Sequence, residues 1–136
     1  MIPCAFCKIL SGDFDALIIR RGGLTTAFMD RNPVAPGHVL VVPNKHFECM
    51  DDAEGSYLEE LASTSREIGL LQKEKLGATG YNVLVANGRS AQQSVFHLHF
   101  HVIPRFDDDS IDLWFDRKRL DYPFHDVEAA FRKLLY

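Results

Sequence analysis

One long segment of the chain carries its apolar residues at the spacing of an α-helix. Between Leu58 and Leu71 these residues fall on one helical face, and Gly77 then provides a helix stop signal. Asp51 and Glu54 stand at capping-box spacing before the first of them. The pattern predicts one long helix that begins near Asp51 and ends at Gly77.

The remaining apolar runs are short and predict strands and two short helices. Turn signals such as Gly22-Gly23 and Pro36-Gly37 separate the strands. The predicted strands span residues 16–20, 24–30, 38–43, 81–85 and 96–103, the short helices span 4–10 and 127–134, and a solvated turn spans 107–109. Because hairpin-like loops join most strands and one long helix is inserted among them, we expect an antiparallel α+β sheet.

Length, composition and charge narrow the class of protein. The 136 residues are 46% apolar and 25% charged, so we expect one domain over residues 1–136 that folds without disulfides. A formal charge of −4 argues against a general nucleic-acid binder, which needs a basic surface. No apolar stretch approaches the roughly 18 residues of a membrane span, and because the first residues lack a basic region followed by a long apolar one, we expect an unexported protein. Three cysteines, an odd number, suit reduced thiols, so we expect a soluble cytoplasmic protein.

Residues 96–103 alternate apolar residues with three histidines. The period of two places His97, His99 and His101 on one face of a strand and their apolar neighbours on the other. With an unperturbed pKa of about 6.5, imidazole acts as a nucleophile, a proton donor or a metal ligand near neutral pH. Three interpretations are open at this point: phosphoryl chemistry, a catalytic metal site and a polar cross-strand ladder.

The loop before this strand favours phosphoryl chemistry. Residues 87–94 combine hydroxyls, amides and backbone N–H groups that suit phosphate oxygens. Phosphoryl transfer needs such donors because the charge on the non-bridging oxygens must be stabilised. Metal ligation by the histidines does not require them.

The motif and several further segments resemble the histidine triad (HIT) family. The matching segments are His97-Leu98-His99-Phe100-His101-Val102-Ile103, Ala27-Phe28-Met29-Asp30, Ala35-Pro36-Gly37-His38-Val39-Leu40-Val41-Val42-Pro43, Lys45-His46 and Gln93-Ser94-Val95-Phe96, with Phe6 and Lys8-Ile9 near the start. The resemblance implies a five-stranded antiparallel sheet with one long and one or two short helices. It also implies a homodimer whose sheets join edge to edge.

The resemblance further implies roles for four histidines. His99 matches the nucleophile that attacks the α-phosphorus of a nucleotide and forms a covalent nucleotidyl-histidine, which water then cleaves. His101 matches the residue that contacts the phosphate and its leaving group, a role that suits a general acid or hydrogen-bond donor. His38 and His97 match supporting histidines. Because uridylyltransferase relatives carry glutamine in place of His101, hydrolysis is favoured over transfer to a sugar phosphate.

The resemblance implies that the ligand is a purine nucleotide substrate with an AMP or GMP moiety. Asp30 matches the acid that accepts hydrogen bonds from the ribose hydroxyls. Ser94, accompanied by Gln93, matches a hydroxyl donor to the phosphate. The residues that match the walls of the base pocket are Phe6, Ile9, Phe28 and Leu40.

Two departures from the family pattern motivate a second hypothesis. Ala86 replaces a phosphate-contacting amide of many members, with Asn87 beside it as the substitute ligand, and Gln92 replaces a usual glycine. The leading hypothesis is a hydrolase that cleaves the α-phosphate bond of nucleoside phosphoramidates or dinucleoside polyphosphates. The alternative is a nucleotide-binding or sensing module with little turnover. The base and the leaving group are open, and we expect their determinants in the tail after Pro104.

Two cysteines near the start predict a metal site. Cys4 and Cys7 have the C-x-x-C spacing that grips one tetrahedral metal, which needs two more ligands. Some HIT members that resemble this chain bind zinc through such a pair, a histidine after the central strand and the first triad histidine. The implied structural zinc is held by Cys4, Cys7, His46 and His97, and the alternative is two buried free thiols.

Overall fold

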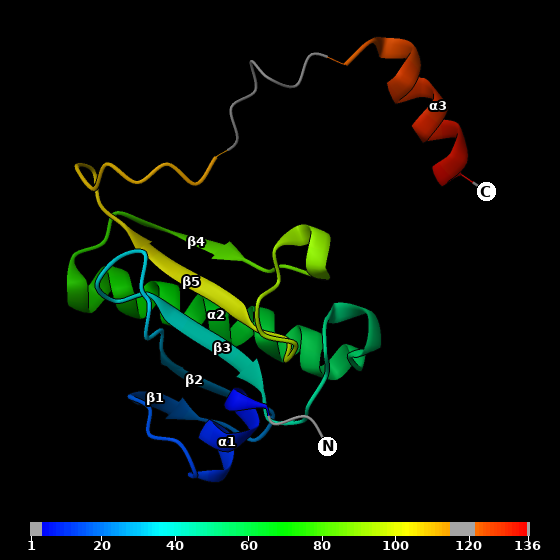
Figure 1. Cartoon of the computed structure of the whole chain (residues 1–136). Helices are drawn as coiled ribbons and strands as arrows, with labels where there is room; N and C mark the ends of the chain where they lie inside the picture. The colour runs from blue at the N-terminus through cyan, green and yellow to red at the C-terminus, as the bar shows by residue number, and fades with distance from the viewer. Residues whose placement is uncertain (1–3, 115–121, 136) are drawn as a thin grey trace.

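A five-stranded antiparallel sheet in the order β1-β2-β3-β5-β4 organises the fold, which confirms the predicted α+β class. The computed structural model describes residues 4–114 and 122–135 (Figure 1). The strands are β1 Ile18–Arg21, β2 Thr25–Met29, β3 Val39–Pro43, β4 Gly80–Leu84 and β5 Phe100–Arg105. The helices are α1 Ala5–Ser11, α2 Gly55–Leu76 and α3 Phe124–Leu134, with short 3-10 turns η1 Met50–Asp52 and η2 Arg89–Ala91.

The two faces of the sheet pack against different helices because side chains alternate along each strand. On β2, Ala27 belongs to the core between the sheet and α2, whereas its neighbour Phe28 belongs to the core under α1. The larger core includes Ala27, Val41, Leu61, Ile68, Leu98, Phe100 and Val102, and the smaller includes Phe6, Ile9, Phe28, Leu40 and Val42. Figure 1 shows α1 and α2 on opposite sides of β2 and β3. The smaller core is the one that builds the candidate site.

The predicted start of the long helix is wrong, whereas its predicted end is confirmed. Asp51 lies in η1, and α2 begins at Gly55 after Glu54, whose side chain makes no capping hydrogen bond. The neighbouring carboxylate of Asp52 instead accepts hydrogen bonds from backbone N–H groups of the preceding loop. At the other end Gly77 takes a left-handed conformation with φ of 75°, which glycine adopts without steric cost.

The predicted strand over residues 96–103 is wrong in its first half, since β5 begins at Phe100. The ladder to β3 pairs Val41 with Phe100 and continues through Val39. Toward the start of β5 the ladder ends at Phe100, because the next positions of β3 lead to Pro43, which has no N–H to donate. The Leu98 N–H donates to the Phe47 carbonyl at 2.7 Å instead. His97 and His99 therefore lie just outside the regular sheet.

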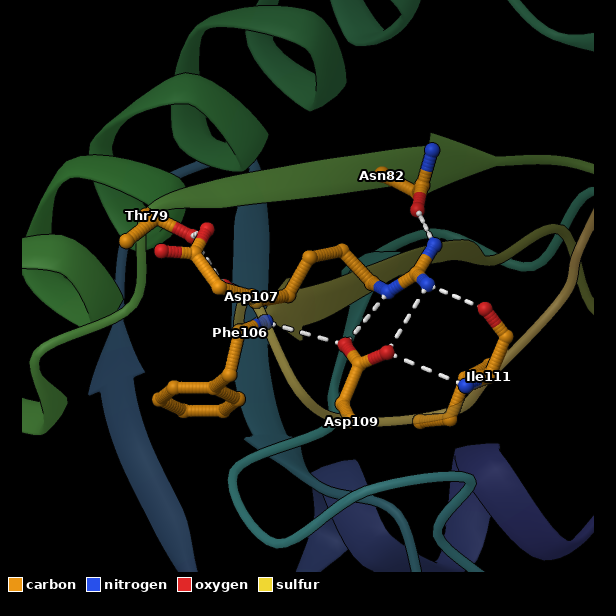
Figure 2. Close-up of polar contacts among 7 residues, drawn as sticks. Thr79, Asn82, Phe106, Asp107, Asp109 and Ile111 are labelled. Carbon is orange, nitrogen blue, oxygen red and sulfur yellow. Dashed lines mark hydrogen bonds and ion pairs between the residues drawn. The ribbon is translucent and has the colours of Figure 1, made fainter.

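A salt bridge organises the chain where it leaves β5. The Arg105 guanidinium donates to both carboxylate oxygens of Asp109, at 2.8 and 3.1 Å, to the Asn82 side chain at 2.9 Å, and to the Ile111 carbonyl (Figure 2). This guanidinium, together with the backbone N–H groups of Phe106 and Ile111, holds the pKa of Asp109 well below its usual range. The expected solvated turn is therefore wrong at this aspartate, whose side chain is 11% exposed.

The C-terminal part confirms a short helix and leaves its apolar side chains exposed. α3 contains no buried residue and stands apart from the sheet (Figure 1). The exposed apolar residues of α3 are Phe124, Val127, Phe131 and Leu134. In the part of the chain that the structure describes, no helix joins the length and the apolar character that a bilayer crossing demands.

Candidate functional site

A cavity of about 310 Å³ opens beside the histidines, on the face of the sheet that carries α1. The predicted site residues that line it are Phe6, Ile9, Phe28, Asp30, Leu40, Ser94, His99 and His101. Two larger cavities, of about 590 and 550 Å³, have no histidine in their walls. The smaller cavity is therefore the candidate site, since it alone of the three combines apolar walls with histidine side chains.

Two predicted phosphate ligands lie outside this cavity and support its loop instead. The Gln93 side chain is buried, accepts from the Gly88 N–H at 2.9 Å, and donates to the carbonyls of Glu48 and Val95 at 2.6 and 3.0 Å. The Asn87 side-chain oxygen accepts from the Met50 N–H at 2.8 Å. The hydrogen bonds of Gln93 fix the loop that brings Ser94 to the cavity.

His99 has a defined tautomer. Its Nδ1 lies 2.8 Å from the carbonyl oxygen of His97, and a carbonyl only accepts, so Nδ1 carries the hydrogen. Burial lowers the pKa of His99, against the opposing effects of that hydrogen bond and of Asp30. The neutral ring therefore keeps a free lone pair on Nε2. A buried imidazole in this state, lining a cavity, can act as a nucleophile.

His101 has the opposite arrangement, set by a chain of hydrogen bonds. The Val34 backbone N–H donates to His38 Nδ1 at 3.1 Å, so neutral His38 carries its hydrogen on Nε2. That Nε2–H donates to His101 Nδ1 at 2.9 Å, which leaves the hydrogen of neutral His101 on Nε2. The cavity thus holds an imidazole acceptor and an imidazole donor side by side, with ring centroids 4.9 Å apart.

Burial keeps the rings of His38 and His101 uncharged. It lowers the pKa of His101 to about 4, and the neighbouring rings of His99 and His38 act in the same direction. The pKa of His38 is lowered for the same first reason, although Asp30, 3.4 Å from its Nε2, opposes the shift. Both rings are therefore neutral near pH 7, and the assigned tautomers describe that state.

A second cluster joins Cys4, Cys7, His46 and His97, whose donor atoms all lie within 4.8 Å of one another. His97 Nδ1 lies 3.1 Å from His46 Nδ1, 3.4 Å from the Cys4 sulfur and 3.6 Å from the Cys7 sulfur. Four donors around a tetrahedral zinc are separated by about 3.3 to 3.8 Å, given the usual zinc–nitrogen and zinc–sulfur bond lengths. The observed spacings come close to that geometry.

The protonation of this cluster also suits a metal. His97 Nε2 donates to the Pro43 carbonyl at 3.0 Å, so its Nδ1 lone pair faces the sulfurs. A carbonyl partner of this kind orients metal-binding histidines in general. Burial and the neighbouring Cys4 raise the pKa of the Cys7 thiol to about 11, an effect that a bound dication reverses. The donor set therefore fits zinc.

A third group, Asp30, His38 and His101, also brings its donor atoms within 4.8 Å. It fits a metal poorly, because His38 Nδ1 already accepts from Val34. Coordination through Nε2 would then require an imidazolate anion. This group is better described as a hydrogen-bonded relay.

Comparison with known proteins agrees with this geometry: a family model described as the HIT domain matches residues 11–108. The chain belongs to the HIT family. Among HIT relatives, an uncharacterized HIT-like protein of Methanocaldococcus jannaschii is 41% identical over 107 residues, 78% of this chain and 81% of that protein. The adenosine 5'-monophosphoramidase of Schizosaccharomyces pombe is 35% identical over 76% of this chain and 75% of its own length. A Zn-bound histidine triad family protein from Mycobacterium smegmatis superposes with a TM-score of 0.79 at 33% identity, covering 83% and 82% of the two chains.

Several groups of this HIT site are backbone atoms that no residue-type argument can find. The Val34 N–H and the carbonyls of Pro43 and His97 set the three tautomers. Further cavity-lining residues that the sequence analysis missed are Met29, Arg31, Asn32 and Val95. Most of them adjoin predicted residues in the chain, and that proximity was the only available signal.

Proposed function

We propose that this HIT protein is a nucleotide hydrolase that cleaves nucleoside phosphoramidates or dinucleoside polyphosphates at the α-phosphorus. One observation carries the proposal: His99 offers an unprotonated Nε2 in the same cavity where His101 offers an Nε2–H. Their different hydrogen bonds thus make His99 the nucleophile and His101 the hydrogen-bond donor, although both are imidazoles. The similarity to a monophosphoramidase supports the choice of reaction.

In the first step, the His99 Nε2 lone pair forms a bond to phosphorus. The bond to the leaving group breaks and its electron pair stays with the leaving atom, which accepts a hydrogen bond from the His101 Nε2–H and takes its proton from solvent. The His99 ring becomes cationic while its Nδ1–H remains bonded to the His97 carbonyl, which stabilises this charge. His38 continues to donate to His101 Nδ1 and holds that ring in place.

In the second step, water attacks the phosphorus of the nucleotidyl-histidine. The nitrogen–phosphorus bond breaks and its electrons return to His99 Nε2. The water proton passes to solvent, which balances the proton taken up in the first step and restores the starting state of both histidines.

The cavity suggests how a purine nucleotide is held. We propose that Phe6, Ile9, Phe28 and Leu40 form the base walls. The Asp30 carboxylate, whose Oδ1 already accepts from the Asn32 N–H at 2.9 Å, also accepts from the ribose hydroxyls. Ser94 donates to the phosphate. In this proposal Gln93 and Asn87 act through the loop that they fix rather than by direct contact.

We also propose a structural zinc at Cys4, Cys7, His46 and His97, supported by the fit of the donor set. Bound zinc supplies a crosslink between α1, the loop after β3 and the segment before β5, and takes no part in the reaction. One domain over residues 1–136 and a cytoplasmic location are part of the proposal, the latter because all three cysteines are free thiols.

A homodimer that pairs the edges of two sheets completes the proposal. β4 is an edge strand, and its residues Val83 and Leu84 are 42% and 40% exposed. An edge strand with exposed apolar side chains is a ready surface for a second strand.

The test of the reaction is a trapped intermediate. The parent chain is mixed with adenosine 5'-phosphoramidate, quenched in alkali at early times and mapped by mass spectrometry, and we expect one adenylyl group on His99. The His99→Asn variant should form no adduct and lose at least about a thousandfold in turnover. The His125→Asn variant, changed on exposed α3, is the matched control and should react like the parent.

Two results would contradict this reaction. Turnover by His99→Asn at the parental rate would exclude the covalent route. Tight AMP binding by the parent with neither adduct nor product would select the second candidate, a nucleotide-binding or sensing module, which the alanine at position 86 favours.

A further inference from the structure

The short helix α1 contributes to two sites at once. Its N-cap residue Cys4 and its Cys7 belong to the thiol–imidazole cluster. Between and after them, Phe6 and Ile9 line the candidate nucleotide cavity. A helix of seven residues is marginal by itself, so its position depends on these attachments.

Phe6 lies between the cluster and the cavity. Its ring is buried and meets the His97 ring edge-on at 5.8 Å and the His99 ring at 5.1 Å. It also contacts Phe28 of the cavity wall at 5.5 Å. A displacement of α1 that moves Phe6 must therefore change the packing around His99, because a close-packed interior transmits small shifts.

A second connection runs through the backbone of His97. Its Nδ1 faces the sulfurs of Cys4 and Cys7, while its carbonyl accepts the Nδ1–H of His99 at 2.8 Å. One residue thus joins the cluster to the hydrogen bond that sets the His99 tautomer. Phe6 and His97, whose rings also meet each other, thus both join the cluster to the cavity.

We propose that metal binding at Cys4, Cys7, His46 and His97 controls nucleotide affinity, because it fixes α1 and His97 and thereby positions Phe6 and His99 at the cavity. This inference rests on the proposed nucleotide site and on the proposed zinc. In it Phe6 is a positioning residue that acts on His99. Coupling of two ligands is reciprocal, so the nucleotide tightens zinc by the same factor that zinc tightens the nucleotide.

The experiment measures AMP binding by calorimetry to the full chain with and without Zn²⁺, with circular dichroism confirming that both forms are folded. We expect AMP to bind about tenfold more tightly to the zinc form, within the usual range of such couplings. Saturating AMP should lower the Zn²⁺ dissociation constant by the same factor, measured by competition with a chromophoric chelator. Equal AMP affinity in both folded forms, or no Zn²⁺ binding, overturns the inference and leaves the proposed hydrolase intact.

Variants separate the coupling from simple stabilisation. Phe6→Ala should still bind Co²⁺ with a thiolate charge-transfer band, yet bind AMP equally with and without metal, and Phe6→Tyr should restore the difference. Ile9→Ala, which changes a cavity wall of the same helix, is the matched control. It should weaken AMP binding in both forms and keep their ratio. A Phe6→Ala chain that keeps the full ratio contradicts the role of Phe6.

If the metal-free chain unfolds, a further variant tests the coupling instead. His46 is exposed and lies outside the cavity walls, so His46→Asn weakens the cluster without removing a cavity residue. At a Zn²⁺ concentration that saturates only the parent, AMP affinity of this variant should fall. Unchanged affinity there overturns the coupling, whereas failure of AMP to bind any form, zinc-loaded parent included, overturns the proposed nucleotide site itself.

Discussion

At the scale of single residues, hydrogen-bond partners distinguish histidines that are chemically identical. His97, His99 and His101 have the same side chain, but their partners differ. A carbonyl and a neighbouring imidazole leave the hydrogen of His97 and His101 on Nε2, whereas a second carbonyl places that of His99 on Nδ1. The sequence analysis predicts the three histidines, Asp30 and Ser94 as parts of one site. Asp30, Ser94, His99 and His101 line the cavity, and His97 belongs to the neighbouring thiol–imidazole cluster. The sequence could not predict which nitrogen carries each proton, since that depends on which backbone or side-chain atom each ring meets in the folded chain.

The relay between His38 and His101 predicts a pH dependence of stability. Inside the fold the pKa of His101 is lowered to about 4, mainly by burial, with His99 and His38 acting alike and Asp30 opposing. Between that pH and about 6.5 the unfolded chain binds a proton that the native chain does not, so stability falls as pH falls through this window. The slope is roughly 1 kcal/mol per pH unit for such a group.

Urea unfolding at pH 7.5, 6.5, 5.5 and 4.5 measures this effect by difference. His101→Gln should lower stability at pH 7.5 but show a shallower decline toward acid than the parent. His125→Gln, on α3, should follow the parent at every pH because its ring is exposed to solvent. Parallel curves for His101→Gln and the parent would contradict the assigned burial effect.

At the scale of elements, helix and strand positions were predicted well and their beginnings poorly. The start of α2 was misplaced because Asp52 satisfies loop N–H groups, and the start of β5 because Pro43 ends the partner strand. The first error comes from hydrogen bonds within one short loop, and the second comes from a partner strand elsewhere in the chain. The apolar periodicity that predicted the elements depends only on local order, so their existence and type were predicted correctly.

The contact of α2 with β4 predicts the effect of a glycine substitution. A Cβ on Gly69 would lie 2.4 Å from the ring of Tyr81, so Gly69→Ala forces this ring to shift from its packing against α2. We expect a loss of about 1–3 kcal/mol, although alanine is the better helix former. Gly55→Ala in the same helix meets nothing within 4 Å and is the matched control, expected to be neutral or slightly stabilising. Denaturant unfolding of both variants checks this, and a Gly69→Ala chain as stable as Gly55→Ala would contradict it.

At the scale of the whole molecule, the edge strand β4 and the C-terminal part both leave apolar side chains exposed. Arg105 and Asp109 fix the chain at its exit from β5, and α3 keeps its apolar side chains exposed (Figures 1 and 2). Of the aromatic residues that follow, Trp114 and Tyr122 are 60% and 68% exposed, and Phe115 lies outside the described residues. Exposed apolar surface of this kind is consistent with the proposed second copy.

The proposed edge-to-edge dimer predicts a change in mass on substitution. Val83→Lys places a charge on the exposed edge strand β4, and charged edges resist strand pairing. We expect the parent to run as a dimer in light scattering and Val83→Lys to dissociate. Leu17→Lys, at a residue 76% exposed next to the opposite edge strand β1, is the control and should remain dimeric. A monomeric parent would reject the dimer, and a dimeric Val83→Lys would move the interface away from β4.

The amino-acid order by itself determined the α+β class, the family and the identity of most residues around the cavity. The class follows from periodicity and residue type, which are properties of neighbours in the chain, whereas the family and the residues of the cavity follow from the resemblance of several short motifs to HIT proteins. Only the tertiary structure decided the proton positions on His38, His97, His99 and His101, and the contact of Phe6 with both sites. The partners of His38 and His99 are backbone atoms close in the chain, and those of His97, His101 and Phe6 lie in distant segments. In both cases the contact depends on the folded backbone, and the order of residue types does not record which atom a side chain meets.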